Sequence, residues 1–226
     1  NTLNIIREFG LSAEVLVAGE NTPLLYEQIK EFNPKIVVVG SCEAKDRLGD
    51  VSAKVFVGAE GITHALNEAK GRVVVNALVG YRGLAPTLQA ISQGRKVALA
   101  NKESLVAAGK FIDTSRIIPI DSEHFGLWYL NHGRKASKMT ITASGGAFRD
   151  TPLHQIPQAT VAQALAHPNW SMGKKITIDS ATMANKLFEL LEARWLFGEG
   201  ITYDALIETR SIIHALIEFT DGVTTA

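Results

Sequence analysis

The chain has 226 residues, 46% of them hydrophobic, so it can bury one substantial core and a second, smaller one. Its 23 basic and 23 acidic residues cancel and alternate along the chain, which argues against nucleic acid or a charged membrane surface as a partner. The single cysteine, the absence of a signal peptide and the lack of any apolar run near the roughly 20 residues of a membrane helix favour a cytoplasmic protein.

The first part of the chain, to about Ala108, alternates predicted helices and strands. Leu3, Ile6 and Phe9 form a helical stripe closed by Gly10, and a second helix should run from Pro23 to Phe32. Further helices are expected around 62–69 and 84–92. Five short apolar strands are expected in AEVLVAG, KIVVVG, AKVFVG, RVVVNALVG and KVALA. Such runs, buried on both faces, are typical of a doubly wound parallel sheet, which binds ligands at the carboxyl ends of its strands.

From about Ile117 the pattern becomes α+β. RIIPID leads into DSEHFGLWYL, and KMTITASGGAF precedes a loop with two prolines and a helix ending at His167. The segment HPNWSMG then separates that helix from a predicted strand, KKITID, and a long helix over Ser180–Phe197. Apolar alternation after Gly198 predicts further strand. We therefore expect a Rossmann-like domain with a mostly parallel sheet over 1–116 and an α+β catalytic domain over 117–226.

The chain begins at Asn1 and stops in GVTTA, halfway through an expected hairpin. We therefore expect an interior piece of a longer protein. Cys42 is expected to be a half-buried loop thiol.

The predicted helix over Ser180–Phe197 carries a polar stripe. At about 100° per residue, Asn185, Glu189 and Glu192 share one face, with Lys186 at its edge. Apolar side chains fill the opposite side: Met183, Leu187, Leu190 and Leu191. Such a stripe can also be an ordinary solvated surface.

Asp121 and Glu123 stand two residues apart as the chain leaves a predicted strand, so their side chains should point the same way. Together with a carboxylate from the long helix they would form an oxygen cage for a hard divalent cation. In the alternative, Asp121 or Ser122 caps the helix that follows, which needs only one of these residues.

Three further positions have both a functional and an ordinary interpretation. Lys102 follows a strand end, where it could bind an anion or polarise a carbonyl, or be a solvated lysine. The glycines after Ser144 could bring backbone N–H groups to an oxyanion, or form a simple turn. Trp170 and Met172, outside any apolar period, suggest a mobile cover over a ligand, although Trp170 could instead fill the core.

The segment DSATMANK places Ser180, Asn185 and Lys186 at and just inside a helix start. A hydroxyl, an amide and an ammonium beside helix N–H groups suit a phosphate. Ser180 could also be a simple N-cap.

Taken in order, ANKESLV, PIDSEH, ASGGAF and HPNWSMGKKITIDSATMANKLFELLEARWLF resemble the 1-deoxy-D-xylulose 5-phosphate reductoisomerase family over essentially the whole chain. The resemblance implies isomerisation and reduction of 1-deoxy-D-xylulose 5-phosphate to 2-C-methyl-D-erythritol 4-phosphate, in non-mevalonate isoprenoid biosynthesis. It implies NADPH, a divalent cation (Mg, Mn or Co), a sugar-phosphate substrate and a homodimer, with no nucleic-acid or membrane partner.

The resemblance also implies roles for individual residues. The metal ligands would be Asp121, Glu123 and Glu189, and the catalytic residues Lys102, Glu123 and His167. Substrate would contact Lys102, Ser122, Glu123, Ser144, His167, Ser180, Asn185, Lys186 and Glu189. Trp170 and Met172 would form the lid. Cofactor contacts would come from Gly19, Glu20, Asn21, Asn101, Glu103 and Gly173.

The chain departs from the family pattern in four respects. The glycine-rich phosphate loop, expected immediately before Asn1, and the C-terminal helical domain lie outside it. Glu20 stands where the family usually has a basic residue near the adenosine 2′-phosphate, and a carboxylate there ordinarily favours a free 2′-hydroxyl. The sequence Glu208-Thr209-Arg210-Ser211 replaces the commoner His-Pro-Gln-Ser. The alternatives are another NAD(P)-dependent sugar-phosphate or homoserine-type dehydrogenase, or a non-catalytic core fragment.

Overall fold

The computed structural model describes residues 2–171 and 173–226, which form two compact units, Asn1–Ala98 and Leu99–Ala226. The boundary lies inside β5 (Lys96–Leu99), ahead of the expected one at residue 116. Met172, expected in the lid, lies outside the described residues. None of the helices within the described ranges combines the length and apolar character that crossing a membrane requires.

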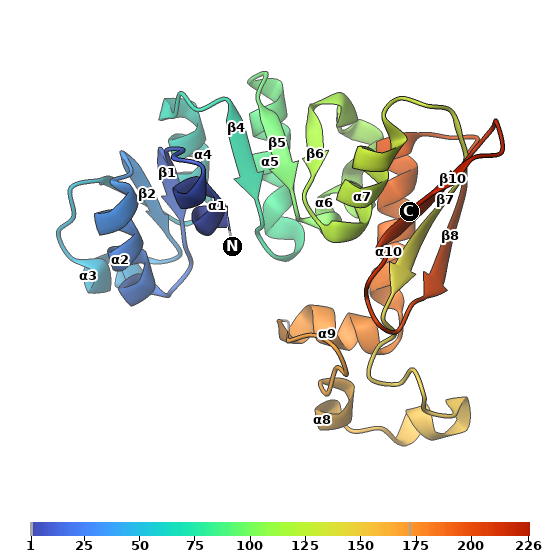
Figure 1. Ribbon diagram of the computed structural model, residues 1–226. Helices are drawn as coiled ribbons and strands as arrows, with labels where there is room; N and C mark the ends of the chain where they lie inside the picture. The colour runs from blue at the N-terminus through green and yellow to red at the C-terminus, as the bar shows by residue number, and fades with distance from the viewer. Residues whose placement is uncertain (1, 172) are drawn as a thin grey trace. The chain divides into compact units, whose positions relative to one another are not determined.

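The first unit is built around a parallel sheet of order β1-β2-β3. Its strands are β1 (Val15–Val17), β2 (Ile36–Val39) and β3 (Lys54–Val57), and its helices are α1 (Thr2–Glu8), α2 (Thr22–Phe32), α3 (Cys42–Leu48) and α4 (Gly58–Glu68). β4 (Val73–Asn76), a 3-10 turn (Gly80–Gly83) and α5 (Leu84–Ser92) follow (Figure 1).

Helices cover both faces of this sheet, as a doubly wound fold requires. Val37 and Val39 pack with α2 and α3 on one face, whereas Ile36 and Val38 pack with Ala65 of α4 on the other. The predicted α/β class is therefore confirmed. The expectation that all the strands are buried on both faces is wrong: β2 is buried throughout, but the β4 residue Val73 is 56% exposed.

The second unit continues from β5 through α6 (Lys102–Ala108), 3-10 turns at Gly109–Phe111 and Thr114–Arg116, β6 (Ile117–Pro119) and α7 (Ser122–Asn131). A four-stranded mixed sheet of order β10-β9-β7-β8 follows. Its strands are β7 (Ala136–Ala143), β8 (Thr202–Ile207), β9 (Ala215–Phe219) and β10 (Thr224–Thr225). β7 is parallel to β8 and antiparallel to β9, so the predicted α+β character is present.

One face of this sheet is covered by α7 and α10 (Ala184–Phe197) (Figure 1). The shared core contains Leu127 of α7, Ala193 of α10, and Met139 and Ile217 from adjacent strands. Between β7 and α10 lie a 3-10 segment (Leu153–Gln158), α8 (Val161–Ala164) and α9 (Lys174–Ala181).

Two predictions for the segment before α10 are wrong. KKITID forms α9 rather than a strand, because its buried residues Thr177, Ser180 and Ala181 follow a helical spacing and Lys175 pairs with Asp179 one turn later at 2.7 Å. The long helix begins at Ala184 rather than Ser180, since Met183 takes a left-handed conformation, with φ of 62°, that ends the helical path.

Two smaller predictions also need correction. Ser180 lies in the last turn of α9 and is not the N-cap of the long helix, which is Met183. Cys42 is exposed in the first turn of α3 rather than half-buried in a loop.

Candidate functional site

Two strand ends position the first part of the site. The Ile120 N–H donates to the Leu99 carbonyl at 3.1 Å, which brings the ends of β5 and β6 together. Each strand then leads into a helix capped by a polar side chain: Asn101 accepts from the Ser104 N–H at 3.0 Å, and Asp121 accepts from the His124 N–H at 2.8 Å. Lys102, Ser122 and Glu123 thereby lie in the first turns of α6 and α7.

The capping interpretation is therefore correct for one contact of Asp121, but it does not explain the position of Glu123. Glu123 lies inside α7 rather than in an extended strand, so the argument that the two acids alternate along a strand is wrong. Its Oε1 atom accepts from Lys186 Nζ at 2.7 Å, across from α10.

A chain of buried charges joins α6, α7 and α10. Lys186 Nζ lies 2.7 Å from Glu123 Oε1 and 2.7 Å from Glu189 Oε2, so the two carboxylates share one ammonium group. Lys102 Nζ binds the other oxygen of Glu189 at 2.7 Å. The side chain of Glu189 is 5% exposed and that of Lys186 8%. The polar stripe of α10 is thus a buried face, and the solvated-surface interpretation is wrong.

His124 links Asp121 to α10. Its ring is fully buried, with Nδ1 at 2.8 Å from Asp121 Oδ1 and Nε2 at 2.8 Å from the Glu189 carbonyl oxygen. Burial opposes the charged ring, but the hydrogen bond and charge of Asp121 prevail and raise the pKa of His124 to about 9. Since both nitrogens face acceptors, the imidazolium form satisfies both contacts.

Two acids, Asp121 and Glu123, are kept ionised by cationic neighbours although burial opposes their charge. For Asp121 burial is outweighed mainly by His124, and for Glu123 by Lys186, so that the pKa of each is lowered. Burial and the attraction of Glu189 act in opposite directions on Lys102, and the net effect raises its pKa. Glu192 differs, because burial raises its pKa to about 7.

Three carboxylates were expected to hold a hard cation here. Of the proposed ligands, Glu123 and Glu189 meet at Lys186, and Asp121 is linked to the Glu189 main chain through His124. Among the described residues, the group of three whose ligand atoms lie within 4.8 Å of one another is Asp121, His124 and Glu192, which shares only Asp121 with the proposed set. The donor chemistry, carboxylate oxygens balanced by displaceable ammonium groups, fits a magnesium-like ion.

The expected phosphate-binding residues fall into two groups. The loop after β7 lies against the end of α9, because a Cβ at Gly146 would lie 1.9 Å from the Ser180 carbonyl oxygen. Ser144 and Ser180 are therefore on neighbouring segments. Asn185 is 8% exposed, and its Oδ1 has no hydrogen-bond partner among the described residues. Lys186, expected at the phosphate, instead contacts the two acids.

His167 lies in the expected lid segment and orders its own turn. Its Nδ1 accepts from the N–H groups of Asn169, at 3.1 Å, and Trp170, at 3.0 Å. Burial and, less strongly, the charge of Arg149 lower its pKa. Trp170 is 48% exposed, so it does not fill the core. The lid itself stays a prediction.

The loop at Glu208–Ser211 receives a structural explanation. The Glu208 carboxylate accepts from the Ile212 N–H at 2.7 Å and the Arg210 N–H at 3.1 Å, which closes the turn between β8 and β9. The Thr209 carbonyl then accepts from Asn169 Nδ2 at 2.8 Å. This loop thus holds the segment that contains Trp170.

Several side chains at the site were missed from the sequence. His124 stands one turn after Asp121, so helical spacing could have found it, whereas Glu192 was placed on the polar stripe but given no role. Arg149 donates to the Ser144 carbonyl at 2.9 Å, and His214 Nδ1 lies 3.8 Å from Glu123 Oε1. No local sequence signal marks these last two.

The expected cofactor contacts lie in both units. Gly19, Glu20 and Asn21 follow β1, where Asn21 caps α2. In the second unit Asn101 caps α6, Glu103 pairs with Lys175 at 3.1 Å, and Gly173 precedes α9.

The protein is thus a doubly wound α/β unit followed by an α+β unit, and the second unit contains a buried centre of carboxylates and lysines. Two family models match the chain: 1-deoxy-D-xylulose 5-phosphate reductoisomerase over residues 1–109, and the C-terminal domain of the same enzyme over 117–197. The chain belongs to the 1-deoxy-D-xylulose 5-phosphate reductoisomerase family.

Individual relatives agree with this assignment. The reductoisomerase of Wolinella succinogenes is 56% identical over 223 residues, covering 98% of this chain and 62% of that protein. That of Helicobacter pylori (strain Shi470) is 53% identical, covering 98% and 61%. The chain therefore spans about three fifths of the length of these relatives.

Solved structures show the same fold. A DOX-P reductoisomerase in complex with NADPH, fosmidomycin and magnesium matches with a TM-score of 0.87 and 34% identity, over 99% of this chain and 61% of that one. The Zymomonas mobilis enzyme in complex with NADPH matches with a TM-score of 0.86 and 34% identity, over 100% and 62%.

Proposed function

We propose that the full-length protein converts 1-deoxy-D-xylulose 5-phosphate to 2-C-methyl-D-erythritol 4-phosphate with NADPH and a divalent cation. The observation that carries the proposal is the buried centre in which Glu123 and Glu189 share Lys186, beside Lys102 and Asp121. Solved relatives contain NADPH and magnesium. A homodimer, implied by the family resemblance, and a cytoplasmic location, favoured by the composition, are proposed with it.

Asp121, Glu123 and Glu189 would hold the cation, which supplies Lewis acidity and a template for neighbouring oxygens of the substrate. Lys102, 16% exposed at the edge of the centre, would donate a hydrogen bond to the oxygen on which negative charge develops. His124 fixes the orientation of Asp121, and Lys186 keeps Glu123 and Glu189 side by side before the cation binds.

The distal phosphate would be anchored by Ser144, Ser180 and Asn185. Among the described side chains none caps the start of α10, so the positive end of that helix is available to an anion. Anchoring this remote group would orient the reacting end and favour closure of the segment around Trp170. His167, whose pKa is lowered, would lie at the same end as a neutral hydrogen-bonding group.

The test uses Glu189→Gln in the full-length protein. Loss of a charged ligand should weaken magnesium binding, measured by calorimetry, by about 100-fold or more, and lower kcat/KM with 1-deoxy-D-xylulose 5-phosphate by at least as much. Glu199→Gln is the matched control, because Glu199 is 81% exposed just beyond α10. Unchanged magnesium affinity in Glu189→Gln would remove the proposed metal site. Reduction of the substrate without any divalent cation would favour a simple dehydrogenase.

A further inference from the structure

The loops after β1 and β2 lie against each other at the carboxyl edge of the first sheet. The Gly40 N–H donates to the Gly19 carbonyl at 3.0 Å, and a Cβ at Gly40 would lie 2.8 Å from Glu20 Oε1. A Cβ at Gly19 would meet no atom within 4 Å, so the backbone here is open to a ligand. This is the edge at which open parallel sheets bind nucleotides.

Glu20 is held by a single cation. Its Oε2 atom accepts from Arg47 Nη2 at 2.6 Å and from Ser41 Oγ at 3.1 Å, and the Glu20 carbonyl lies 3.4 Å from the same Arg47 nitrogen. Arg47, and then Ser41, lower the pKa of Glu20. The side chains of Arg47 and Glu20 are 51% and 60% exposed, so both stay accessible from solvent.

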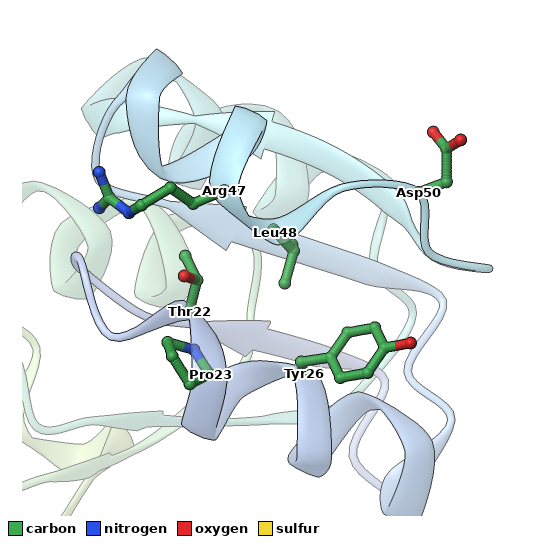
Figure 2. Close-up of a pocket in the computed structure, with 6 residues that line it drawn as sticks. All are labelled: Thr22, Pro23, Tyr26, Arg47, Leu48 and Asp50. Carbon is green, nitrogen blue, oxygen red and sulfur yellow. The ribbon is translucent and has the colours of Figure 1, made fainter.

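Arg47 also lines a cleft of about 410 Å³ between α2 and α3. The other lining residues are Thr22, Pro23, Tyr26, Leu48 and Asp50. Figure 2 shows the guanidinium group extending to the end of the cleft where Thr22 lies, away from Tyr26 and Asp50. The volume suits part of a small-molecule ligand, and the cation at one end, away from the Asp50 carboxylate at the other, suits a phosphate group on it.

General chemistry assigns opposite preferences to these two side chains. A carboxylate after such a strand binds the ribose 2′-hydroxyl of NAD, whereas a nearby arginine accommodates the 2′-phosphate of NADP. A guanidinium group carries five N–H donors, and the contacts with Glu20 use one of its nitrogens. Arg47 can therefore neutralise Glu20 and still bind a phosphate.

We propose that Arg47 recognises the 2′-phosphate of NADPH while it neutralises the Glu20 carboxylate beside it. This rests on the proposed use of NADPH. The chain thereby keeps a cation at the 2′-phosphate although the residue at 20 is acidic.

Equilibrium binding to the full-length protein tests this without turnover. Dissociation constants for NADPH and NADH come from nucleotide fluorescence, and those for 2′,5′-ADP and ADP from calorimetry. Arg47→Gln should weaken NADPH and 2′,5′-ADP about tenfold, which is one charge-assisted contact near solvent, and leave NADH and ADP unchanged. Arg47→Lys should weaken NADPH and 2′,5′-ADP less than Arg47→Gln does. Glu20→Gln should tighten NADPH several-fold, because it removes a repulsive charge.

Lys45→Gln is the matched control, since it removes one exposed positive charge from the same helix. An equal loss in Lys45→Gln would mean that only the general field matters, and would overturn the assignment of Arg47. Equal effects of Arg47→Gln on NADPH and NADH, or none on either, would overturn it while leaving NADPH-dependent reduction intact. A wild-type protein that binds neither nucleotide and reduces no substrate would remove the proposed function itself.

Discussion

At the scale of single residues, the buried acids of the second unit each face a cationic side chain, except for one acid. Asp121, Glu123 and Glu189 face His124, Lys186 and Lys102 at 2.7–2.8 Å. Glu192 Oε2 lies 3.6 Å from His124 Nδ1 and has no hydrogen-bond partner among the described residues. Leaving a buried carboxylate unpaired is costly, which explains why burial raises the pKa of this group to about 7.

The pH dependence of stability should reveal Glu192. Its pKa is about 7 in the folded chain against an ordinary 4.5, so the folded state binds the extra proton and stability falls as pH rises through this interval. His124, raised from 6.5 to about 9, contributes stability that is complete below 6.5 and lost as pH rises towards 9. Thermal melting of the chelator-treated protein across both intervals measures the two slopes.

Glu192→Gln mimics the protonated acid. We therefore expect the melting temperature of this variant to change less with pH between about 4.5 and 7, while its fall at higher pH, which comes from His124, stays in place. Glu199→Gln, at an exposed position, serves as the control. An undiminished lower slope in Glu192→Gln would assign that slope to another group.

At the scale of elements, the contact between the loop after β7 and the end of α9 sets the expected phosphate end of the site. Gly145 has a φ of +83°, and Gly146 leaves no room for a side chain beside Ser180. Arg149 fastens the same loop by donating to the Ser144 carbonyl at 2.9 Å. The glycines are therefore required for close packing, whatever the loop binds.

Gly146→Ala should test this contact. The added methyl group would lie 1.9 Å from the Ser180 carbonyl oxygen, so loop and helix must separate, at a cost of about 1–3 kcal/mol in the free energy of unfolding. Chemical denaturation measures that loss. Gly71→Ala is the control, because its nearest atom would lie at 3.5 Å. Equal midpoints for the two variants would show that the loop yields freely.

At the scale of the whole molecule, the hydrophobic pattern of the sequence predicted the order of helices and strands better than it predicted local conformation. The strands from Val15 to Leu99 and the helices between them follow apolar runs and caps that depend on nearby residues. KKITID misled because β-branched residues favour strands, while burial of Thr177 and Ser180 stabilises a helix that only tertiary contacts explain. The stripe on α10 was predictable from helical spacing, whereas the pairing of Lys186 with Glu123, 63 residues apart, was not.

The division into two compact units predicts where each ligand should act. We expect magnesium to slow hydrogen exchange in peptides covering the start of α7 and the part of α10 around Glu189, because its ligands would tie these elements together in the second unit. 2′,5′-ADP should instead protect peptides covering Gly19–Thr22 and α3 in the first unit. Exchange measured by mass spectrometry on the full-length protein gives both maps. Asp121→Asn should abolish the magnesium pattern and spare the nucleotide pattern, whereas Arg47→Gln should weaken the nucleotide pattern and spare the magnesium pattern. Magnesium protection that leaves α10 unchanged would contradict a site that includes Glu189.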